Sequence, residues 1–261
     1  ELTDLNLIEA LDEPALTHGR PGKLFRLARE SRYVVGVSVD VHQCHVGTAG
    51  IDGKVLVDPV GFKTPSTYEE LLNQIETQVK AQMDGRGGTC AGIGLAVPGI
   101  YDGIDGRVVF ARFLPFLNGQ QVGRDIARRT GIRVTTVQEN HGLALFQQFN
   151  GKGRDFSHFV VVEIGAGVGA SVVVDGNRIF GQSGFTGEIG RFIVNPAEDT
   201  GDCPGCLESY ASETAILAAV SARLGRAVAP GRAGGRGGLA GRHGAGRSGR
   251  GLHRRTARRS A

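Results

Sequence analysis

The sequence predicts an α/β protein with two lobes, and three observations support this prediction. Apolar runs typical of strands alternate along the chain with runs whose apolar residues recur every three or four positions, as in amphipathic helices. A second set of strands is expected after the helical run 140–151. The 261 residues, 40% of them hydrophobic, suffice for one large or two ordinary domains with a real core.

Residues 1–22 are predicted to form a helix followed by a turn. "LTDLNLIEAL", residues 2–11, places apolar side chains three positions apart, which indicates one apolar helix face. "HGRPG", residues 18–22, has the glycine and proline content of a turn. Because the first residue is Glu1 rather than methionine, we expect the natural N-terminus to lie upstream.

The first lobe is predicted over residues 23–138. Its clearest element is a helix over 66–83, capped by Ser66 or Thr67. Four apolar residues share one face of this helix: Leu71, Leu72, Ile75 and Val79. The other expected elements are two strands within 23–40, a meander over 44–62 that turns at Asp52-Gly53, a strand within 88–103, a short helix over 119–132 and a strand over 133–138.

The second lobe is predicted over residues 139–225. It is expected to contain a helix over 140–151 that ends at Gly151, followed by a glycine-turned hairpin over 158–181. Few further helices follow in the sequence, so we expect this lobe to be truncated.

The composition changes abruptly in residues 226–261. This segment contains ten Arg and no acidic residue, so removing it changes the net charge from +4 to −6. The basic character of the chain therefore comes from this segment and says nothing about a nucleic-acid face on the folded part. With few large apolar residues, the segment is predicted to be disordered. An Arg/Gly-rich nucleic-acid arm is one interpretation, and a frameshifted gene end, which the abrupt change favours, is the other.

Cysteine usage and hydropathy indicate a cytoplasmic protein. The four cysteines, two of them close together, are more typical of a reducing compartment than of a disulfide scaffold. No apolar run approaches the roughly 18 residues of a membrane helix, and no signal-peptide pattern is present. We therefore expect no association with a membrane.

Several loops carry residues suited to ligand binding. "EIGAGVGA" supplies Gly165, Gly167 and Gly169, whose backbone N–H groups could approach a phosphate, although glycines also serve ordinary tight hairpins. Glu188 and Glu208 lie in loops where carboxylates can accept hydrogen bonds from sugar hydroxyls or simply be solvated. The C-x-x-C pair of Cys203 and Cys206 is half of a zinc site, because a structural zinc takes four ligands.

These pieces, in this order, resemble the ROK family of repressors, open reading frames of unknown function and sugar kinases. The resemblance runs from about residue 19 to about residue 222 and rests on "GLAVPG", "QEN", "IGAGVGASVVVDGNRIFGQSGFTGEIG" and "CLESYAS". It implies a two-lobed, actin-like ATPase (ribonuclease H-like) fold with a sugar in the cleft. The implied sugar contacts are Asn140, His141, Glu188, Arg191 and Glu208, and the implied phosphate contacts are Gly165, Gly167 and Gly169.

The chain departs from the pattern of the family's kinases at the phosphate turn and at the base. The family's Asp-Ile-Gly-Gly-Thr turn aligns with "SVDVH", where Asp40 and Val41 replace the glycines, and a carboxylate there should repel ATP. The family's catalytic Asp aligns with His141, so we assign no catalytic residue, although a histidine can act as a general base. Phe113 stands where the family has an Asn.

The implied zinc site is also incomplete. The family's zinc-binding His aligns with Arg191, and its zinc loop is shortened to "CPGC", which leaves Cys203 and Cys206. No cofactor is therefore expected: zinc binding should be weak or absent, and ATP should not bind.

The N-terminus indicates which branch of the family the chain resembles. In ROK repressors a winged helix-turn-helix precedes the sugar lobe, and "GRPGKLFRL" resembles the end of its wing, so residues 1–22 are interpreted as the end of this DNA-binding domain. The sequence thus predicts a sugar-responsive repressor without kinase activity, a homodimer or tetramer that binds operator DNA. Two alternatives stay open: an ATP-dependent, glucokinase-like hexose kinase, and a truncated, inactive gene product.

Overall fold

A five-stranded mixed sheet forms the centre of the first lobe in the computed structural model, which describes residues 1–11, 23–182, 184–198 and 203–228. Its strands lie in the order β5 (Val55–Lys63), β4 (Gln43–Gly50), β3 (Arg32–Ser38), β6 (Thr89–Val97) and β9 (Val134–Gln138). β3, β6 and β9 are parallel, whereas β4 and β5 continue from β3 as an antiparallel meander. The predicted α/β class is confirmed.

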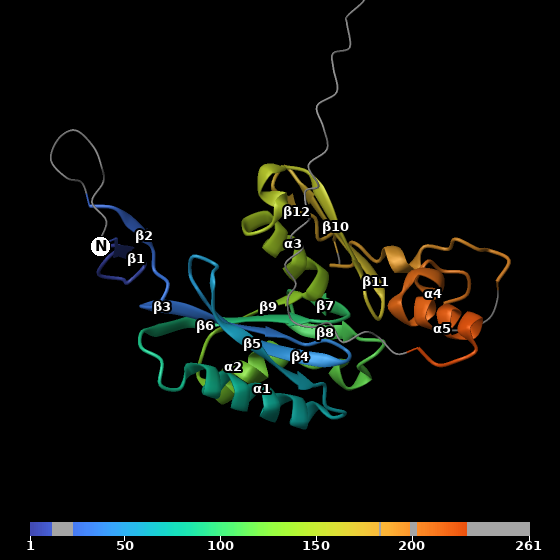
Figure 1. Cartoon of the computed structure of the whole chain (residues 1–261), viewed down its shortest axis with the longest axis horizontal. Helices are drawn as coiled ribbons and strands as arrows, with labels where there is room; N and C mark the ends of the chain where they lie inside the picture. The colour runs from blue at the N-terminus through green and yellow to red at the C-terminus, as the bar shows by residue number, and fades with distance from the viewer. Residues whose placement is uncertain (12–22, 183, 199–202, 229–261) are drawn as a thin grey trace, which may run out of the picture. The chain divides into compact units, whose positions relative to one another are not determined.

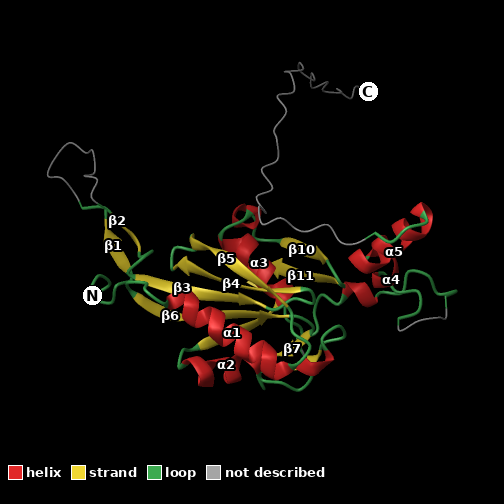
Figure 2. Cartoon of the chain, turned by 60° about the horizontal axis from the view of Figure 1, so that its bottom comes forward, coloured by secondary structure: helices red, strands yellow, loops and turns green. Residues whose placement is uncertain are grey.

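Two helices cover one face of this sheet, α1 (Tyr68–Met83) and α2 (Val122–Thr130), packed beside each other (Figure 2). The cap of α1 is Thr67, whose hydroxyl accepts a hydrogen bond from the backbone N–H of Glu70 at 3.3 Å. The four apolar residues predicted to share a face of α1 are all buried against the sheet. The helices predicted over 66–83 and 119–132 are thus confirmed.

The second lobe begins with α3 (Glu139–Phe149), which follows β9 directly and lies on the face of the first sheet opposite α1 and α2 (Figure 1). α3 packs on an antiparallel sheet of β10 (Phe159–Ile164), β11 (Val168–Val174) and the short β12 (Asn177–Arg178). The predicted hairpin is confirmed, and its register places Glu163 opposite Gly169. This arrangement brings the end of β9, the start of α3 and the β10–β11 turn to one place.

Shorter elements complete the described part of the chain. They are the hairpin β7 (Ile100–Asp102) and β8 (Arg107–Phe110), the 3-10 turns η1 (Pro115–Leu117), η2 (Lys152–Asp155) and η3 (Ile189–Arg191), and the helices α4 (Glu208–Ala211) and α5 (Glu213–Leu224). Within the described ranges, no helix is long and apolar enough to cross a bilayer.

The helix predicted over residues 2–11 is wrong. Turns precede a strand, β1 (Ile8–Ala10), which pairs antiparallel with β2 (Phe25–Leu27). Leu2 and Leu5 remain about half exposed, so the apolar stripe has no surface to cover, and pairing with β2 prevails over the helical period. The predicted turn 18–22 lies outside the described residues, as does 229–261 of the Arg/Gly-rich segment.

Candidate functional site

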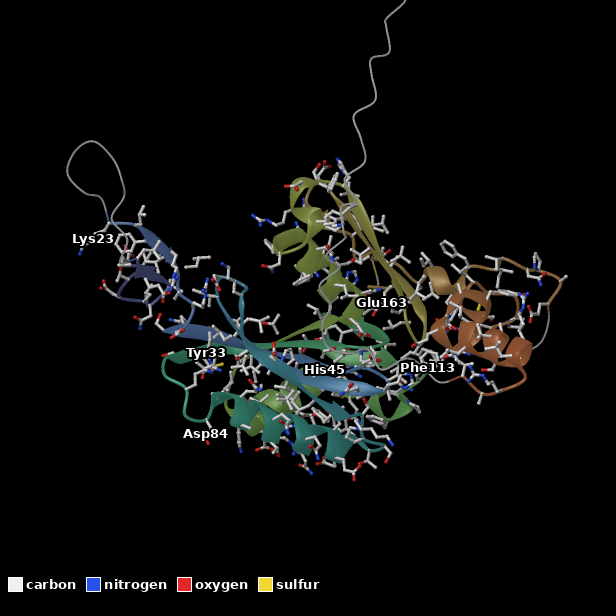
Figure 3. The ribbon with its side chains drawn as sticks, in the orientation of Figure 1. Lys23, Tyr33, His45, Asp84, Phe113 and Glu163 are labelled. Carbon is white, nitrogen blue, oxygen red and sulfur yellow. A yellow bond between two sulfur atoms is a disulfide. The ribbon has the colours of Figure 1, made fainter. Side chains whose placement is uncertain are left out.

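A cavity of about 420 Å³ lies where the two lobes meet. Its wall is built from the turn after β3, the segments around residues 98–100 and 110–114, the start of α3, the β10–β11 turn, the 185–191 loop and the start of α4. Figure 3 labels two of its residues, Glu163 on β10 and Phe113 on the segment before η1. Segments distant in sequence therefore contribute to one site, as is common where domains meet.

Glu208 ties three of these segments together. One carboxylate oxygen accepts a hydrogen bond from Arg112 Nη1 at 2.7 Å, and the other accepts one from the backbone N–H of Val168 at 3.0 Å. Arg112 also lies over the ring of Phe113, 5.4 Å from its centroid. Because the Glu208 side chain is only 13% exposed, this ion pair fixes its carboxylate at the edge of the cavity.

The glycines of the β10–β11 turn make room for these side chains. Gly165, Gly167 and Gly169 all line the cavity. A Cβ atom at Gly167 would lie 2.6 Å from Oε2 of Glu208, the oxygen that accepts from the N–H of Val168, so a side chain there would make the Glu208 carboxylate shift. Glycine at 167 therefore suits the observed position of Glu208, and phosphate binding by this turn stays a prediction.

Glu188 faces the cavity from the loop before η3. Gln138 Nε2 donates a hydrogen bond to its carboxylate at 3.4 Å, and Arg191 lines the cavity nearby. Burial raises the pKa of Glu188 above its ordinary value, while Gln138 and Arg191 act in the opposite direction. Its carboxylate oxygens are hydrogen-bond acceptors placed for a ligand that donates.

Asn140 occupies the first turn of α3 and is 5% exposed. Its Nδ2 donates to the carbonyl of Ala170 at 2.9 Å, which fixes the orientation of the amide. The Oδ1 atom has no hydrogen-bond partner among the described residues, and Asn140 lines the cavity. A buried acceptor without a partner costs free energy, but Oδ1 is covered by protein atoms, so a ligand in the cavity reaches it only if neighbouring side chains move.

His141, in contrast, lies away from the cavity. Its Nδ1 is 3.0 Å from Ser171 Oγ, and its ring packs on Phe180 with centroids 4.8 Å apart. Burial, and then the charge of Arg178, lower the pKa of His141 below its ordinary value. Each helical residue turns about 100° from the one before it, so the residue two positions after Glu139 faces β11 and not the cavity. Of the five proposed sugar contacts, only His141 does not line it.

Three carboxylates that line the cavity were not predicted from the sequence, Glu139, Glu163 and Glu213, whereas Asp40, which lines it too, was predicted to disfavour ATP at the phosphate turn. Burial, and then the charges of Glu163 and Asp40, raise the pKa of Glu139 to about 8. Burial and Asp40 likewise raise the pKa of Glu163. Two features of the sequence could have revealed two of these carboxylates. Glu163 is a charged residue within the apolar run "FVVVEI", and Glu139 stands at the junction between a strand and a helix.

The two cysteines proposed as half of a zinc site form a disulfide, Cys203–Cys206, with Cα atoms 5.6 Å apart. The two-residue turn between them brings the Cα atoms into the range that a disulfide needs. Cys44 and Cys90 are free thiols. The described residues contain no group of three or more His, Cys, Asp or Glu side chains that could hold a metal, so they do not fit the zinc that the resemblance implies.

Comparisons with known proteins agree with this architecture. The family model described as "ROK family" matches residues 34–232. The xylose repressor of Caldicellulosiruptor bescii is 28% identical over 77% of this chain and 52% of its own length. The glucokinase of Thermotoga maritima is 30% identical over 70% of this chain and 58% of its own. The N-acetylglucosamine repressor of Escherichia coli O157:H7 is 26% identical over 83% and 54%.

Solved structures show the same fold. A ROK family transcriptional regulator, described as a homologue of the E. coli MLC protein, superimposes with a TM-score of 0.72 at 22% identity, over 86% of this chain and 58% of its own. A ROK glucokinase from Streptomyces griseus, in complex with glucose and AMPPNP, gives 0.67 at 21% identity, over 74% and 61%.

The chain spans about half the length of the curated relatives it matches. The expected actin-like ATPase fold is confirmed, and because the family model covers residues 34–232, the chain belongs to the ROK family.

Proposed function

We propose that this chain is the sugar-binding part of a ROK transcriptional repressor that has no kinase activity. The observation that carries the proposal is the cavity itself, which presents hydrogen-bond acceptors together with an acidic group of side chains. Repressors of sugar genes stand among the relatives with the highest similarity, beside glucokinases.

The acceptors suit a neutral sugar. Glu188 and Glu208 offer carboxylate oxygens at the cavity wall, and Asn140, whose covered Oδ1 has no partner within the described ranges, also lines it. Sugar hydroxyls are donors that such groups bind well, and a site built on hydrogen bonds rejects ligands that lack the matching hydroxyl. Arg191 supplies a donor on the same wall.

The acidic side chains Asp40, Glu139 and Glu163 at the cavity wall disfavour the binding of ATP. Asp40 stands in the turn that the resemblance assigns to phosphate, and Glu139 and Glu163 lie close enough to interact electrostatically with it. Placing triphosphate against these carboxylates in a half-buried cavity is unfavourable by Coulomb repulsion. Phosphoryl transfer depends on positioning the nucleotide, so losing that site removes the reaction.

Sugar binding would act through the contact between lobes. Arg112 from the first lobe and Glu208 from the second already form an ion pair at 2.7 Å. A sugar that engages Glu208 and Glu188 would favour one separation of the lobes over another, which is a shift of populations. In a dimer, such a shift would change the spacing of two DNA-binding domains.

The N-terminal strands fit this role. β1 and β2, found in place of the predicted helix, form an antiparallel pair that suits the two strands of a wing, and Arg26 Nε contacts Glu9 across the pair at 2.6 Å. We propose that residues 1–22 and β2 belong to the wing of a winged helix that binds operator DNA. The protein would then act in the cytoplasm as a homodimer or tetramer.

One observation favours the kinase as a second candidate. Glu139, a buried carboxyl at the cavity wall whose pKa is raised to about 8, could accept a proton in its ionised form, which prevails above about pH 8. The kinase assay below therefore includes its variant.

We expect no sugar kinase activity, because Asp40 and Glu163 exclude the nucleotide phosphates. ADP release, measured with a coupled assay across common hexoses and N-acetylated hexosamines, should stay at background for the wild type and for Glu139→Gln alike. Sugar-dependent turnover above about 1 per second that Glu139→Gln abolishes would establish the kinase instead.

A further inference from the structure

The short loop Cys203–Cys206 is held closed by its disulfide and by a tight turn. Gly205 has a φ of +63°, and a Cβ atom there would collide with the carbonyl oxygen of Asn195. Only glycine therefore lets the loop close against its neighbour. Cys206 is fully buried, whereas Cys203 is partly accessible to solvent.

The loop is hydrogen-bonded to the segment that follows Arg191. The backbone N–H groups of Val194 and Asn195 donate to the carbonyl of Gly205 at 2.8 and 3.0 Å. On the other side of the disulfide, the N–H of Leu207 donates to the carbonyl of Phe192 at 2.8 Å. The loop thus joins the chain after Glu188 and Arg191 to the start of α4.

The same loop supports Glu208, the first residue of α4. The hydroxyl of Ser209 donates to the carbonyl of Cys203 at 2.9 Å, and its N–H donates to the carbonyl of Cys206 at 3.0 Å. Glu208 lies between these anchored residues and carries the ion pair with Arg112. The covalent link between the two sulfurs is therefore two residues from a side chain that lines the cavity.

We infer that Cys203 and Cys206 form a reversible thiol–disulfide pair, in place of the family's zinc, and that its oxidation fixes Glu208 for sugar binding. Without a third and fourth ligand among the described residues, the pair cannot make a closed zinc site. Disulfides in reducing compartments are typically transient and redox-sensing. The coupling to sugar rests on the proposed sugar site, whereas the thiol chemistry does not.

The chemistry needs a low-molecular-weight disulfide as oxidant. The thiolate of the accessible Cys203 attacks one sulfur of the oxidant, releases one thiol and forms a mixed disulfide. The thiol of Cys206, after losing its proton, attacks the Cys203 sulfur, forms the internal bond and releases the second thiol. Two protein thiols are oxidised, and one disulfide is reduced to two small thiols, which take up the two protons.

The test equilibrates the chain in mixtures of oxidised and reduced glutathione and then alkylates the free thiols. Mass spectrometry should find Cys44 and Cys90 alkylated in every unfolded sample, and Cys203 and Cys206 alkylated only in reduced ones. Hydrogen exchange over residues 203–212 should be faster in the reduced form. Calorimetry should show sugar affinity about fivefold lower in the reduced form.

Cys203→Ser should show the reduced behaviour in every mixture, and Cys90→Ser, which changes a free cysteine on β6, should behave as the wild type. Zinc chloride added to the reduced chain should be lost on dialysis against a mild chelator. Two results would overturn the inference. One is zinc retained at one ion per chain, and the other is hydrogen exchange and alkylation that stay the same in every redox mixture. If neither the oxidised nor the reduced form binds any sugar, the proposed sugar site is wrong. Alkylation and hydrogen exchange then still test whether Cys203 and Cys206 form a reversible disulfide.

Discussion

Glu139→Gln should make the protein more stable than the wild type at pH 9, by at most about 5 kcal/mol, and should leave stability near pH 4 unchanged. In the folded protein, burial and the charges of Glu163 and Asp40 raise the pKa of Glu139 from its ordinary 4.5 to about 8. Glutamine keeps the shape of the side chain and has no proton to lose.

The direction of the stability change follows from the protonation of Glu139 in the folded and the unfolded chain. Below pH 4.5 the Glu139 carboxyl is neutral in both the folded and the unfolded chain, so its contribution to stability is fully present. Between pH 4.5 and about 8 the unfolded chain releases the proton and the folded chain keeps it. The free energy of unfolding therefore falls as pH rises through this window.

Urea denaturation followed by circular dichroism at intervals from pH 4 to pH 9 measures this effect. Asp155→Asn, which changes an exposed carboxylate outside the cavity, serves as the matched control and should follow the wild type. If the Glu139→Gln and wild-type curves stay parallel over the whole range, Glu139 is not held neutral by its neighbours.

Glu188→Ala should weaken sugar binding tenfold or more. The substitution removes a half-buried acceptor from the cavity and leaves Gln138 Nε2 without its partner. Each hydroxyl or amide group that loses a partner in such a site costs about 1–3 kcal/mol, and about 1.4 kcal/mol corresponds to tenfold in affinity.

Calorimetric titrations with the same sugar measure the affinities of the wild type, Glu188→Gln and Glu188→Ala. Glu188→Gln keeps an oxygen acceptor and should fall between the other two, and Asp155→Ala should bind as the wild type does. An unchanged affinity in Glu188→Ala would remove Glu188 from the site, even if the sugar still binds.

The sequence predicted those parts of the fold that depend on local pattern. The apolar face and cap of α1 lie within one continuous segment, as do the two strands and the turn of the β10–β11 hairpin. The N-terminal helix failed for the opposite reason. The partner of β1 (Ile8–Ala10) is β2 (Phe25–Leu27), which lies further along the chain, and helical periodicity carries no information about that pairing.

The residues of the candidate site also divide into those that the sequence predicted and those that depend on the fold. Motif comparison located Asn140, Glu188 and Glu208, which all line the cavity. It also pointed to His141, because an aligned position does not state which way a helical residue faces. The sequence indicated Asp40 but not its grouping with Glu139 and Glu163, because the three residues come from separate segments and only the fold brings them together.

The central claim is that the cavity binds a sugar and not a nucleotide. Isothermal titration of the chain with a panel of hexoses, pentoses and N-acetylated hexosamines, and separately with magnesium ATP, tests it most directly. The account predicts one-to-one binding of at least one sugar that Glu188→Ala weakens, with no heat of binding from ATP. Binding of ATP to the wild type, or the absence of binding by every sugar of the panel, would contradict it.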